Sequence, residues 1–558
     1  MAQTKQTAAD LVVYGKIYTS KDGQVAEAFA AKDGKYVYVG DKAGAQAYVK
    51  EGATQVIDYS GKGLVMPGCG NGHAHYPMGF AINLVGVVVG ADATPKDFLD
   101  EIIPDAVRKA RETGATSIFG FGWSLVNFQN DMPTRQDLDA ICVDIPIYIA
   151  DNEGHKALTN TCCLVNAGYM TEDGAVLVKE DSIRGGEIVM GADGTPCGYL
   201  KETAGTRARA HLDNDAIYPV SIAKTVLDKV QQHLLSEGYT MFMDGWTNYF
   251  YNDNTYKAAQ EMDEAGDLHV VLGLNYELES WMDLEEGLQA ALESRKYASK
   301  HVLPKWVKLF IDGTVETGTG YVDPVYPDGH NGEPIWTEEE VTRVSEVANN
   351  NDMTVHVHTM GNKACNLAVN GFINGGKDEM RNIIVHVYNI DDADLERMAE
   401  HDIYATSGML WHHGKRENIA AMRELGMVPM HTVGKSYPMK SFFDFGVTLT
   451  GHTDYPALSG SPDDPFGMME IAVTGVLAGE DGDPYWPEEL LTREQYLTAM
   501  TINVAKQLYL EDERGSITKG KYADFILLDT DVLTCPVDEI HKAKVQATYF
   551  EGEKVFSR

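Results

Sequence analysis

The chain has 558 residues, of which 44% are hydrophobic and 23% are charged, a composition typical of a globular protein with a large core. Lysine and arginine number 46 against 83 aspartates and glutamates, so the formal net charge is −37. Nucleic-acid phosphates and anionic lipid surfaces repel so acidic a chain. No stretch approaches about 18 consecutive apolar residues. We therefore expect neither nucleic-acid binding nor a membrane span.

The cysteines and the first residues indicate the compartment. The 7 cysteines are an odd number at low density and include no CxxC pair. The opening MAQTKQTAAD lacks the apolar core of a signal peptide. These features predict a cytoplasmic protein with reduced thiols.

Both ends of the chain read as short strands that alternate with turns. Valine, tyrosine and alanine are frequent in these strands, and pairs such as Asp33-Gly34 break them. The expected strands are Leu11–Ser20, Ala26–Ala31, Tyr36–Gly40, Thr54–Tyr59, Gly63–Met66, Ala523–Asp529, Lys544–Phe550 and Lys554–Phe556. Residues 1–66 and 508–558 are therefore predicted to form one small β-sandwich domain.

The middle of the chain alternates apolar runs with helical stretches. The runs are Leu64–His75, Thr240–Met243, His269–Gly273, Trp306–Ile311, Met353–His358, Asn382–Val387, Asp402–Thr406 and Val447–Thr450. The helices include Ser221–Ser236, Thr255–Ala265, Leu284–Tyr297, Thr337–Asn350, Asp392–Glu400 and Arg416–Leu425. Strands and helices in this order predict an α/β fold, a (β/α)8 TIM barrel over residues 67–507, with its chemistry at the C-terminal strand ends. Residues from about 85 to 215 do not fit the repeat, and we expect an insertion there, with a hairpin turn at Gly191–Gly194.

The triplet His73-Ala74-His75 closes the first barrel strand. Residues i and i+2 of a strand face the same way, so both imidazoles can share one metal ion, although this spacing also occurs in ordinary cores. His358, His386 and Asp454 end three further strands. Imidazole or carboxylate groups at four separate strand ends are hard to explain as core packing. Such groups suit Zn²⁺ or a similar divalent ion.

Lys308 lies inside the apolar strand Trp306–Ile311. One interpretation is an ion pair within the core. The other rests on desolvation, which lowers the pKa of a buried lysine and leaves a neutral amine that can react with carbon dioxide. The resulting carbamate could bridge two metal ions.

Ordered motifs along essentially the whole chain resemble the amidohydrolase superfamily of metal-dependent hydrolases. The frame Gly63–Gly68 precedes the HxH pair, and ligand types then follow in the order Lys, His, His, Asp, as in the binuclear members. Further stretches are similar to the family-3 amidohydrolases, the group that contains N-substituted formamide deformylase. These stretches are Val307–Gly313, His358–Ala364, Thr501–Asp524, Asp151–Asn160 and Gly194–Glu202.

The resemblance implies a ligand set for two zinc ions per chain. The implied metal ligands are His73, His75, Lys308 as a bridging carbamate, His358, His386 and Asp454. Asp454 would also transfer a proton. His356 lies on the same strand face as His358, so strand alternation cannot choose between them, but His358 is nearer the C-terminal mouth and occupies the family's position. The same reasoning places His452 one layer below Asp454.

Four departures from the family pattern affect the surroundings of the site. Asn71 stands where an aspartate usually precedes the HxH pair, and Val385 replaces an acidic residue. His452 occupies a position where a small residue is common, and 411–417 differs from the family's polar segment. None of these changes removes an implied ligand.

Three side chains are candidates for substrate contact. His155 belongs to the insertion motif and could reach over the barrel mouth, or it could cap a local turn. Trp123 is a pocket wall or a core residue. His412 faces the substrate only if its loop folds inward.

The sequence thus predicts a hydrolase that cleaves an amide-like C–N bond of a small molecule. A metal-activated water would attack the substrate, with Asp454 as general base. We expect a homodimer. Two alternatives stay open, a mononuclear aminohydrolase (a deaminase), which needs no bridging lysine, and a degenerate barrel that only binds a ligand.

Overall fold

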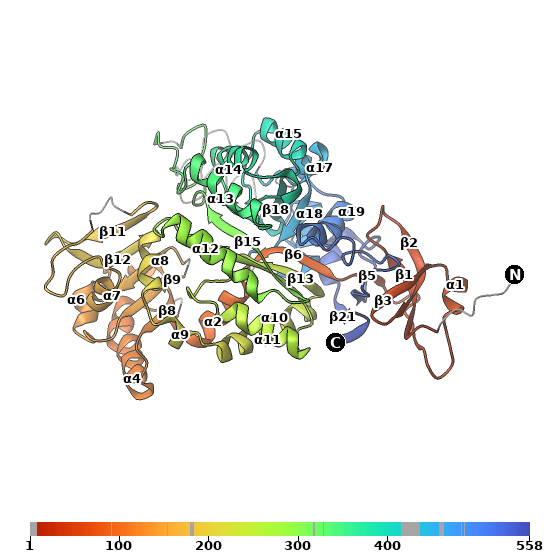
Figure 1. Cartoon of the computed structure of the whole chain (residues 1–558), viewed down its shortest axis with the longest axis horizontal. Coiled ribbons are helices and arrows are strands. Elements are labelled where there is room, and N and C mark those ends of the chain that lie inside the picture. The colour runs from red at the N-terminus through yellow and green to blue at the C-terminus, as the bar shows by residue number, and fades with distance from the viewer. Residues whose placement is uncertain are drawn as a thin grey trace.

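The structure is a computed structural model that describes residues 8–90, 92–152, 154–178, 183–315, 318–326, 328–413, 436–456, 463–480, 482–484 and 486–558. The helix predicted at Arg416–Leu425 lies outside these residues. Three sheets organise the described chain, one in the insertion, one in the barrel and one built from both chain ends. They follow one another along the long axis of the molecule, with the barrel in the middle (Figure 1).

Eight parallel strands form the barrel in chain order, which confirms the predicted α/β architecture. They are β6 (Cys69–Ala74), β13 (Tyr239–Asp244), β14 (Val271–Glu277), β15 (Val302–Phe310), β16 (Thr354–Thr359), β17 (Ile383–His386), β18 (Tyr404–Gly408) and β19 (Leu449–His452). The sheet returns on itself just after β19, where the Asp454 amide donates a hydrogen bond to the His73 carbonyl at 3.2 Å. The barrel is therefore nearly closed.

The predicted first strand, Leu64–His75, is wrong as one element, because the chain forms two strands there. β5 (Leu64–Pro67) pairs antiparallel with β20 (Phe525–Leu528) in the sheet of the chain ends, and only β6 belongs to the barrel. Gly68 separates them, and a Cβ atom on it would lie 2.3 Å from the Thr240 side chain. The chain can pass this close to β13 only with a residue that has no side chain.

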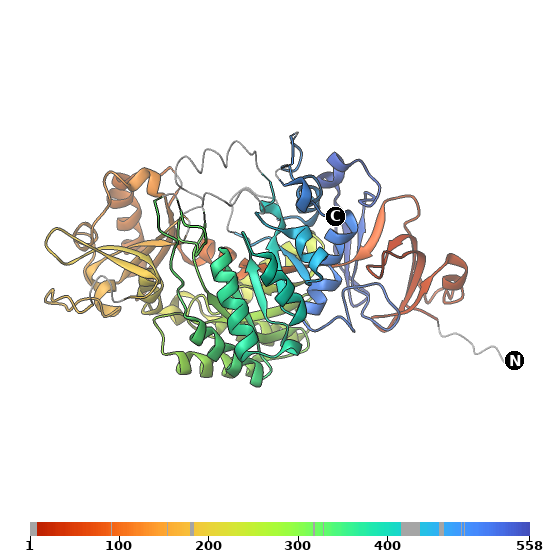
Figure 2. The same ribbon diagram turned by 90° about the horizontal axis from the view of Figure 1, so that it is seen from above.

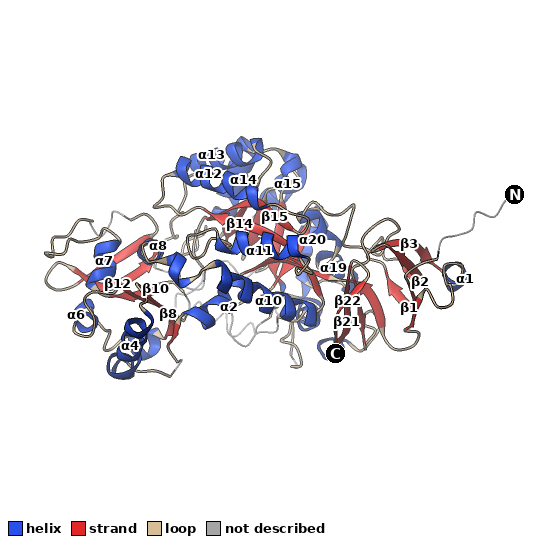
Figure 3. Ribbon diagram, turned by 60° about the horizontal axis from the view of Figure 1, so that its bottom comes forward, coloured by secondary structure: helices blue, strands red, loops and turns tan. Residues whose placement is uncertain are grey.

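Helices cover the outside of the barrel, as the alternating pattern predicts (Figure 3). They include α10 (Val220–Ser236), α11 (Asn254–Ala265), α12 (Leu284–Ser294), α13 (Glu338–Asn350), α14 (Asn362–Gly375), α15 (Asp392–Glu400), α17 (Met439–Phe445) and α18 (Pro465–Thr474). α13 begins where Thr337 and Glu340 form a reciprocal capping box, which satisfies two of the orphan amides at that end. These helices bury apolar faces against the strands and hold the strand ends in place.

The insertion between β6 and α10 forms a sheet of its own, in the order β11-β12-β10-β9-β8-β7. Its strands are β7 (Val87–Val88), β8 (Ile118–Trp123), β9 (Ile147–Asp151), β10 (Lys156–Thr159), β11 (Gly186–Met190) and β12 (Pro196–Glu202). The hairpin predicted at Gly191–Gly194 joins β11 and β12, which pair antiparallel. The sheet and its helices project from one end of the molecule in both views (Figures 1 and 2).

Strands from both chain ends share the third sheet, in the order β22-β21-β20-β5-β1-β2-β3, with β4 paired to β1. The remaining members are β1 (Leu11–Tyr18), β2 (Val25–Lys32), β3 (Lys35–Gly40), β4 (Gln55–Asp58), β21 (Val545–Phe550) and β22 (Glu553–Ser557). The predicted pairing of the two chain ends is therefore present. Its description as a β-sandwich domain with bounds 1–66 and 508–558 stays a prediction.

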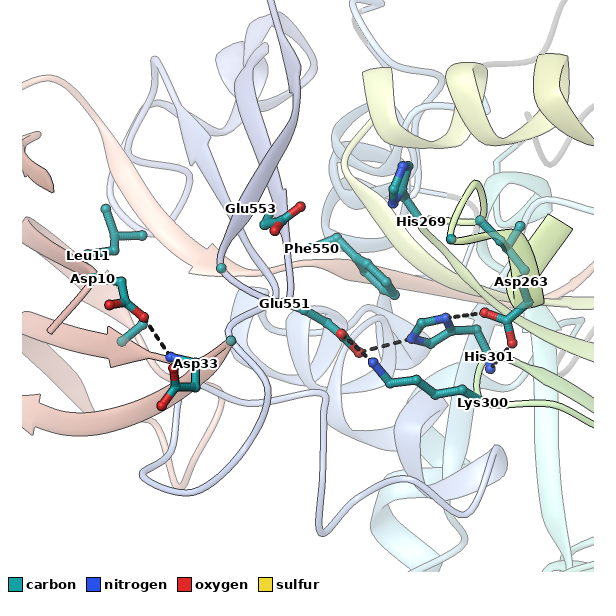
Figure 4. Close-up of a pocket in the computed structure, with 15 residues that line it drawn as sticks. Asp10, Leu11, Asp33, Asp263, His269, Lys300, His301, Phe550, Glu551 and Glu553 are labelled. Atoms are coloured by element: carbon teal, nitrogen blue, oxygen red, sulfur yellow. Dashed lines mark hydrogen bonds and ion pairs between the residues drawn. The ribbon is translucent and has the colours of Figure 1, made fainter.

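A chain of ion pairs joins this third sheet to the N-terminal face of the barrel (Figure 4). His301, just before β15, contacts Asp263 at 2.6 Å and Glu551 at 2.9 Å, and Lys300 contacts Glu551 at 2.5 Å. A cavity of about 590 Å³ lies beside these groups. These groups lie on the face opposite the C-terminal strand ends, which carry the chemistry in barrels of this kind.

None of the helices in the described residues is long and apolar enough to cross a membrane.

Candidate metal centre

The HxH pair and Asp454 meet at the C-terminal mouth of the barrel. The Nε2 atoms of His73 and His75 lie 3.2 Å and 3.4 Å from Oδ1 of Asp454. Gly245, which follows β13, leaves room for both rings, since a Cβ atom there would lie 2.4 Å from His73 and 2.6 Å from His75. This first triad is the arrangement that the strand periodicity and the strand-end positions predict.

Strained backbone holds two of the ligand-type side chains. His386 has φ +72° and Asp454 has φ +51°, and Val387 next to His386 has φ +55°. A β-branched residue at positive φ is a rare and costly conformation. Such strain of about 1–3 kcal/mol for each residue persists where the surrounding structure fixes it, and it gathers at functional sites.

A second triad shares Asp454 with the first. His386, His452 and Asp454 each offer a ligand atom, and these atoms lie within 4.8 Å of one another. The rings of His386 and His452 are 5.0 Å apart, and Trp411 packs against both, at 5.4 Å and 5.3 Å. His452 therefore reaches the ligand cluster, whereas the sequence placed it one layer below.

His358 and His356 differ in their surroundings. Nε2 of His358 lies 3.3 Å from the Gly313 carbonyl oxygen, and its ring is 4.6 Å from that of His386. His356 is deeper in the barrel, where its Nδ1 contacts Oδ1 of Asn275 at 3.1 Å. The structure thus puts His358 at the mouth and His356 in the interior, as expected, but neither belongs to a triad.

Buried donor atoms without partners fit a metal ion at this cluster. Within the described residues, both ring nitrogens of His73 and of His452 lack a hydrogen-bond partner, as does Nδ1 of His386. In a folded protein, leaving a buried polar group without a hydrogen-bond partner costs about 1–3 kcal/mol of stability. Several such groups facing one point are explained when a divalent cation accepts their lone pairs.

Burial keeps these imidazoles neutral, which is the state that binds a metal. It lowers the pKa of His358 to about 3, and Lys308 adds to that effect. It lowers the pKa of His452 to about 4 and holds the pKa of His73 well below its ordinary value.

Lys308 is fully buried on β15, and its Nζ has no hydrogen-bond partner among the described residues. Burial lowers its pKa to about 8, against the opposing charges of Glu277 and Asp454. Glu277 stands beside Lys308 in the register of β14 and β15. A lysine with this pKa is partly a neutral amine at physiological pH, as carbamate formation requires.

The departure at Asn71 has a structural role in this chain. Nδ2 of Asn71 donates to the Thr453 hydroxyl at 2.8 Å, and its Oδ1 accepts from the His73 amide at 3.2 Å. Asn71 therefore ties β6 to the segment after β19, next to both triads. An ionised aspartate could not donate the first of these bonds.

The candidate substrate residues lie in different places. His155 is exposed at the insertion and pairs with Glu202 at 2.9 Å. Trp123 is fully buried in the core of the insertion, where its Nε1 donates to the Ile149 carbonyl at 2.9 Å, so the structure does not bring it to the barrel mouth. His412 is fully buried, and it is the neighbouring Trp411 whose ring packs against that of His452 at 5.3 Å.

Sequence reasoning missed two acidic residues at strand ends. Asp244 ends β13 and Glu277 ends β14, and both are buried. Burial raises the pKa of Asp244 to about 6, opposed by the charge of His75, and raises the pKa of Glu277 well above its ordinary range. The strand-end rule that found His358, His386 and Asp454 could have found Asp244, which directly follows the run Thr240–Met243. Glu277 stands four residues after the run His269–Gly273 and carries no such signal.

Comparison with known proteins shows what this chain is similar to. The chain is 25% identical over 96% of its length to N-substituted formamide deformylase of Arthrobacter pascens, covering 95% of that protein. It is also 25% identical, over 98% of its length and 91% of the other chain, to the Protein LONG AFTER FAR-RED 3 of Arabidopsis thaliana. An uncharacterized metal-dependent hydrolase from Pyrococcus horikoshii shares the fold, with a TM-score of 0.71 at 22% identity over 94% of this chain and 99% of that one. The sequence profile of the amidohydrolase family matches residues 55–556, and the chain belongs to that family.

Proposed function

We propose that this amidohydrolase cleaves an amide-like C–N bond of a small molecule, with Asp454 as the general base. One observation carries the proposal. Oδ1 of Asp454 lies within 3.2–3.4 Å of both HxH ring nitrogens, at the strand ends where this fold does its chemistry.

Asp454 is charged at neutral pH and can accept a proton. Burial opposes its ionisation, but the interaction with the imidazole of His75 lowers the pKa of Asp454 below the ordinary value. In the proposed reaction the Asp454 carboxylate takes the proton of the attacking water. It then delivers this proton to the leaving nitrogen, so that the amide yields a carboxylic acid and an amine.

We propose that each chain holds two Zn²⁺ ions. When bound, they would supply Lewis-acid activation of the water and of the substrate carbonyl. The side chains proposed to hold these ions are His73, His75, Lys308, His358, His386 and Asp454. Lys308 holds the metal as a carbamate, which forms when its neutral amine adds to carbon dioxide and loses a proton. Burial raises the pKa of Glu277, which stands beside Lys308 in the strand register, and this favours the neutral form of its carboxyl group next to the modified lysine.

Two rival functions predict different behaviour. A mononuclear deaminase needs one ion and no lysine bridge. The buried Nζ of Lys308, which has no hydrogen-bond partner among the described residues, disfavours it. A ligand-binding barrel without catalysis needs no buried carboxylate beside the HxH pair, so the position of Asp454 disfavours it.

The experiment is a hydrolysis screen over amides, formamides, ureas, lactams and cyclic imides with the purified, zinc-loaded protein. We expect release of an amine from at least one substrate, its loss with a chelator and its return with Zn²⁺. Deamination of an aminated heterocycle by a protein with a single ion would support the deaminase. Binding without turnover across the screen would support the binder.

The rest of the proposal concerns the whole chain. We place substrate selection at the barrel mouth, with His155 as a candidate contributor, and we propose a homodimer in the cytoplasm. Residues 1–66 and 508–558 are proposed as one β-sandwich domain and residues 67–507 as the catalytic barrel.

A further inference from the structure

We propose that His452 is a ligand of the metal ion that His386 holds, so that the second ion sits between His386, His452 and Asp454. This inference rests on the proposed function, since it requires metal at the barrel mouth. It departs from the ligand set that the family resemblance implies, because His452 stands where a small residue is common.

The distances among the donor atoms are close to those of a formed site. The ligand atoms of His386, His452 and Asp454 all lie within 4.8 Å of one another. Two ligands of one zinc ion are at most about 4.4 Å apart, because each lies about 2.0–2.2 Å from the ion. Small side-chain shifts are therefore enough to close this triad around a cation.

An ordinary core role does not explain His452. Its side chain is 0% exposed, and neither ring nitrogen has a hydrogen-bond partner among the described residues. A core histidine without ligand duty normally pairs at least one nitrogen, since a buried unpaired group costs about 1–3 kcal/mol. His356 has the same burial but follows this rule, because its Nδ1 contacts Oδ1 of Asn275.

The ring of His452 lies among the other ligand-type side chains. The ring lies 5.4 Å from that of His73 and 5.0 Å from that of His386, with Trp411 at 5.3 Å as a wall. Positive φ at His386 and Asp454 fixes the two other members of the triad. Two neighbours of His452 are therefore held in strained conformations that a shared ligand would explain.

His358, the ligand that the resemblance implies for this ion, is placed less well. Its Nε2 is 3.3 Å from the Gly313 carbonyl oxygen, and His358 belongs to neither triad of the described residues. Nδ1 of His358 is buried without a hydrogen-bond partner among the described residues, but His358 is not part of a cluster of ligand atoms within 4.8 Å, whereas His452 is.

The test compares zinc content and zinc affinity of the wild type, His452→Gln and the matched control His356→Gln. Each full-length protein is loaded with Zn²⁺, passed through a desalting column and analysed by mass spectrometry of metals, and Zn²⁺ is then titrated against a competing chelator. We expect two ions in the wild type and in His356→Gln. In His452→Gln we expect one ion, or a second ion bound at least tenfold more weakly. Equal stoichiometry and affinity in His452→Gln and the wild type would overturn the inference.

A second measurement needs no variant, so it decides the matter even where His452→Gln fails to fold. Anomalous diffraction from zinc-loaded wild-type crystals locates the ions. A His452 nitrogen about 2.0–2.1 Å from an ion supports the inference. An ion held by His358 and His386, with His452 farther than about 3 Å, overturns the inference and leaves the proposed function standing. A wild-type protein that takes up no zinc overturns both.

Discussion

Replacing Asp454 with asparagine separates the two roles that we assign to Asp454, metal ligand and general base. Asparagine has the same shape and keeps an oxygen that can face the HxH nitrogens, now 3.2 Å and 3.4 Å from Oδ1. It cannot accept a proton as a base. We therefore expect Asp454→Asn to keep its fold and most of its metal.

Turnover of Asp454→Asn should fall by about 10²–10⁴, the effect of losing a general base. At about 1.36 kcal/mol for each factor of ten, this corresponds to about 2.7–5.4 kcal/mol of lost transition-state stabilisation. The assay is kcat on a confirmed substrate, with metal content measured on the same sample.

The pH profile distinguishes a base from a simple ligand. The pKa of Asp454 is lowered, so wild-type activity is full above that pKa and falls as pH drops through it. This acidic limb should be absent from Asp454→Asn. A kcat within about threefold of wild type with full metal would refute the assignment of Asp454 as base.

Three further predictions concern the bridge, the site's support and the domain junction. Lys308→Ala should lose metal and turnover, and added acetate or propionate should restore part of both. Full zinc content and full turnover in this variant would contradict the two-metal site. Asn71→Ala removes a buried hydrogen bond between β6 and the segment after β19, and it should lower stability by about 1–3 kcal/mol in urea unfolding, with an unchanged midpoint counting against this role. Burial alone would lower the pKa of His301, but its bonds to Asp263 and Glu551 raise it above the ordinary value. The stabilisation it gives is therefore full below the unfolded pKa of about 6.5 and lost as pH rises through the folded pKa. His301→Gln should thus lower the melting temperature more at pH 6 than at pH 9, and an equal loss at both values would show that the charge is not involved.

Much of the barrel could be predicted from the sequence because its strands are continuous apolar runs with a polar residue at the end. A parallel strand buried on both faces has this pattern, and its C-terminal end marks the chemical face. His73, His75, His358, His386 and Asp454 were predicted on that basis, and the structure brings His73, His75 and Asp454 into one triad.

The depth of a side chain in the barrel was harder to predict. Strand alternation places His452 below Asp454, yet the chain leaves regular strand geometry after His452, and Asp454 has φ +51°. Positive φ turns a residue away from the alternating pattern, so the layer order fails at that point. The sequence carries no signal for such backbone strain at a residue other than glycine.

Long-range packing was also invisible in the sequence. The sequence favours a core position for Trp123 over a pocket wall, and only the fold of the insertion shows that its ring packs 5.5 Å from that of Phe128 in the core of the insertion. The sequence assigned Gly63–Met66 to the small terminal domain and also counted Leu64–His75 as the first barrel strand. Only the pairing of β5 and β6 in different sheets decides between these two assignments.

The most direct test of the account is the metal content of the purified wild-type chain, measured by mass spectrometry of metals after removal of loosely bound ions. We predict two divalent ions per chain, mainly zinc, held at the mouth where His73, His75 and Asp454 meet. A chain that holds no ion after exposure to zinc, while still folded, would contradict a metal-dependent hydrolase of this kind.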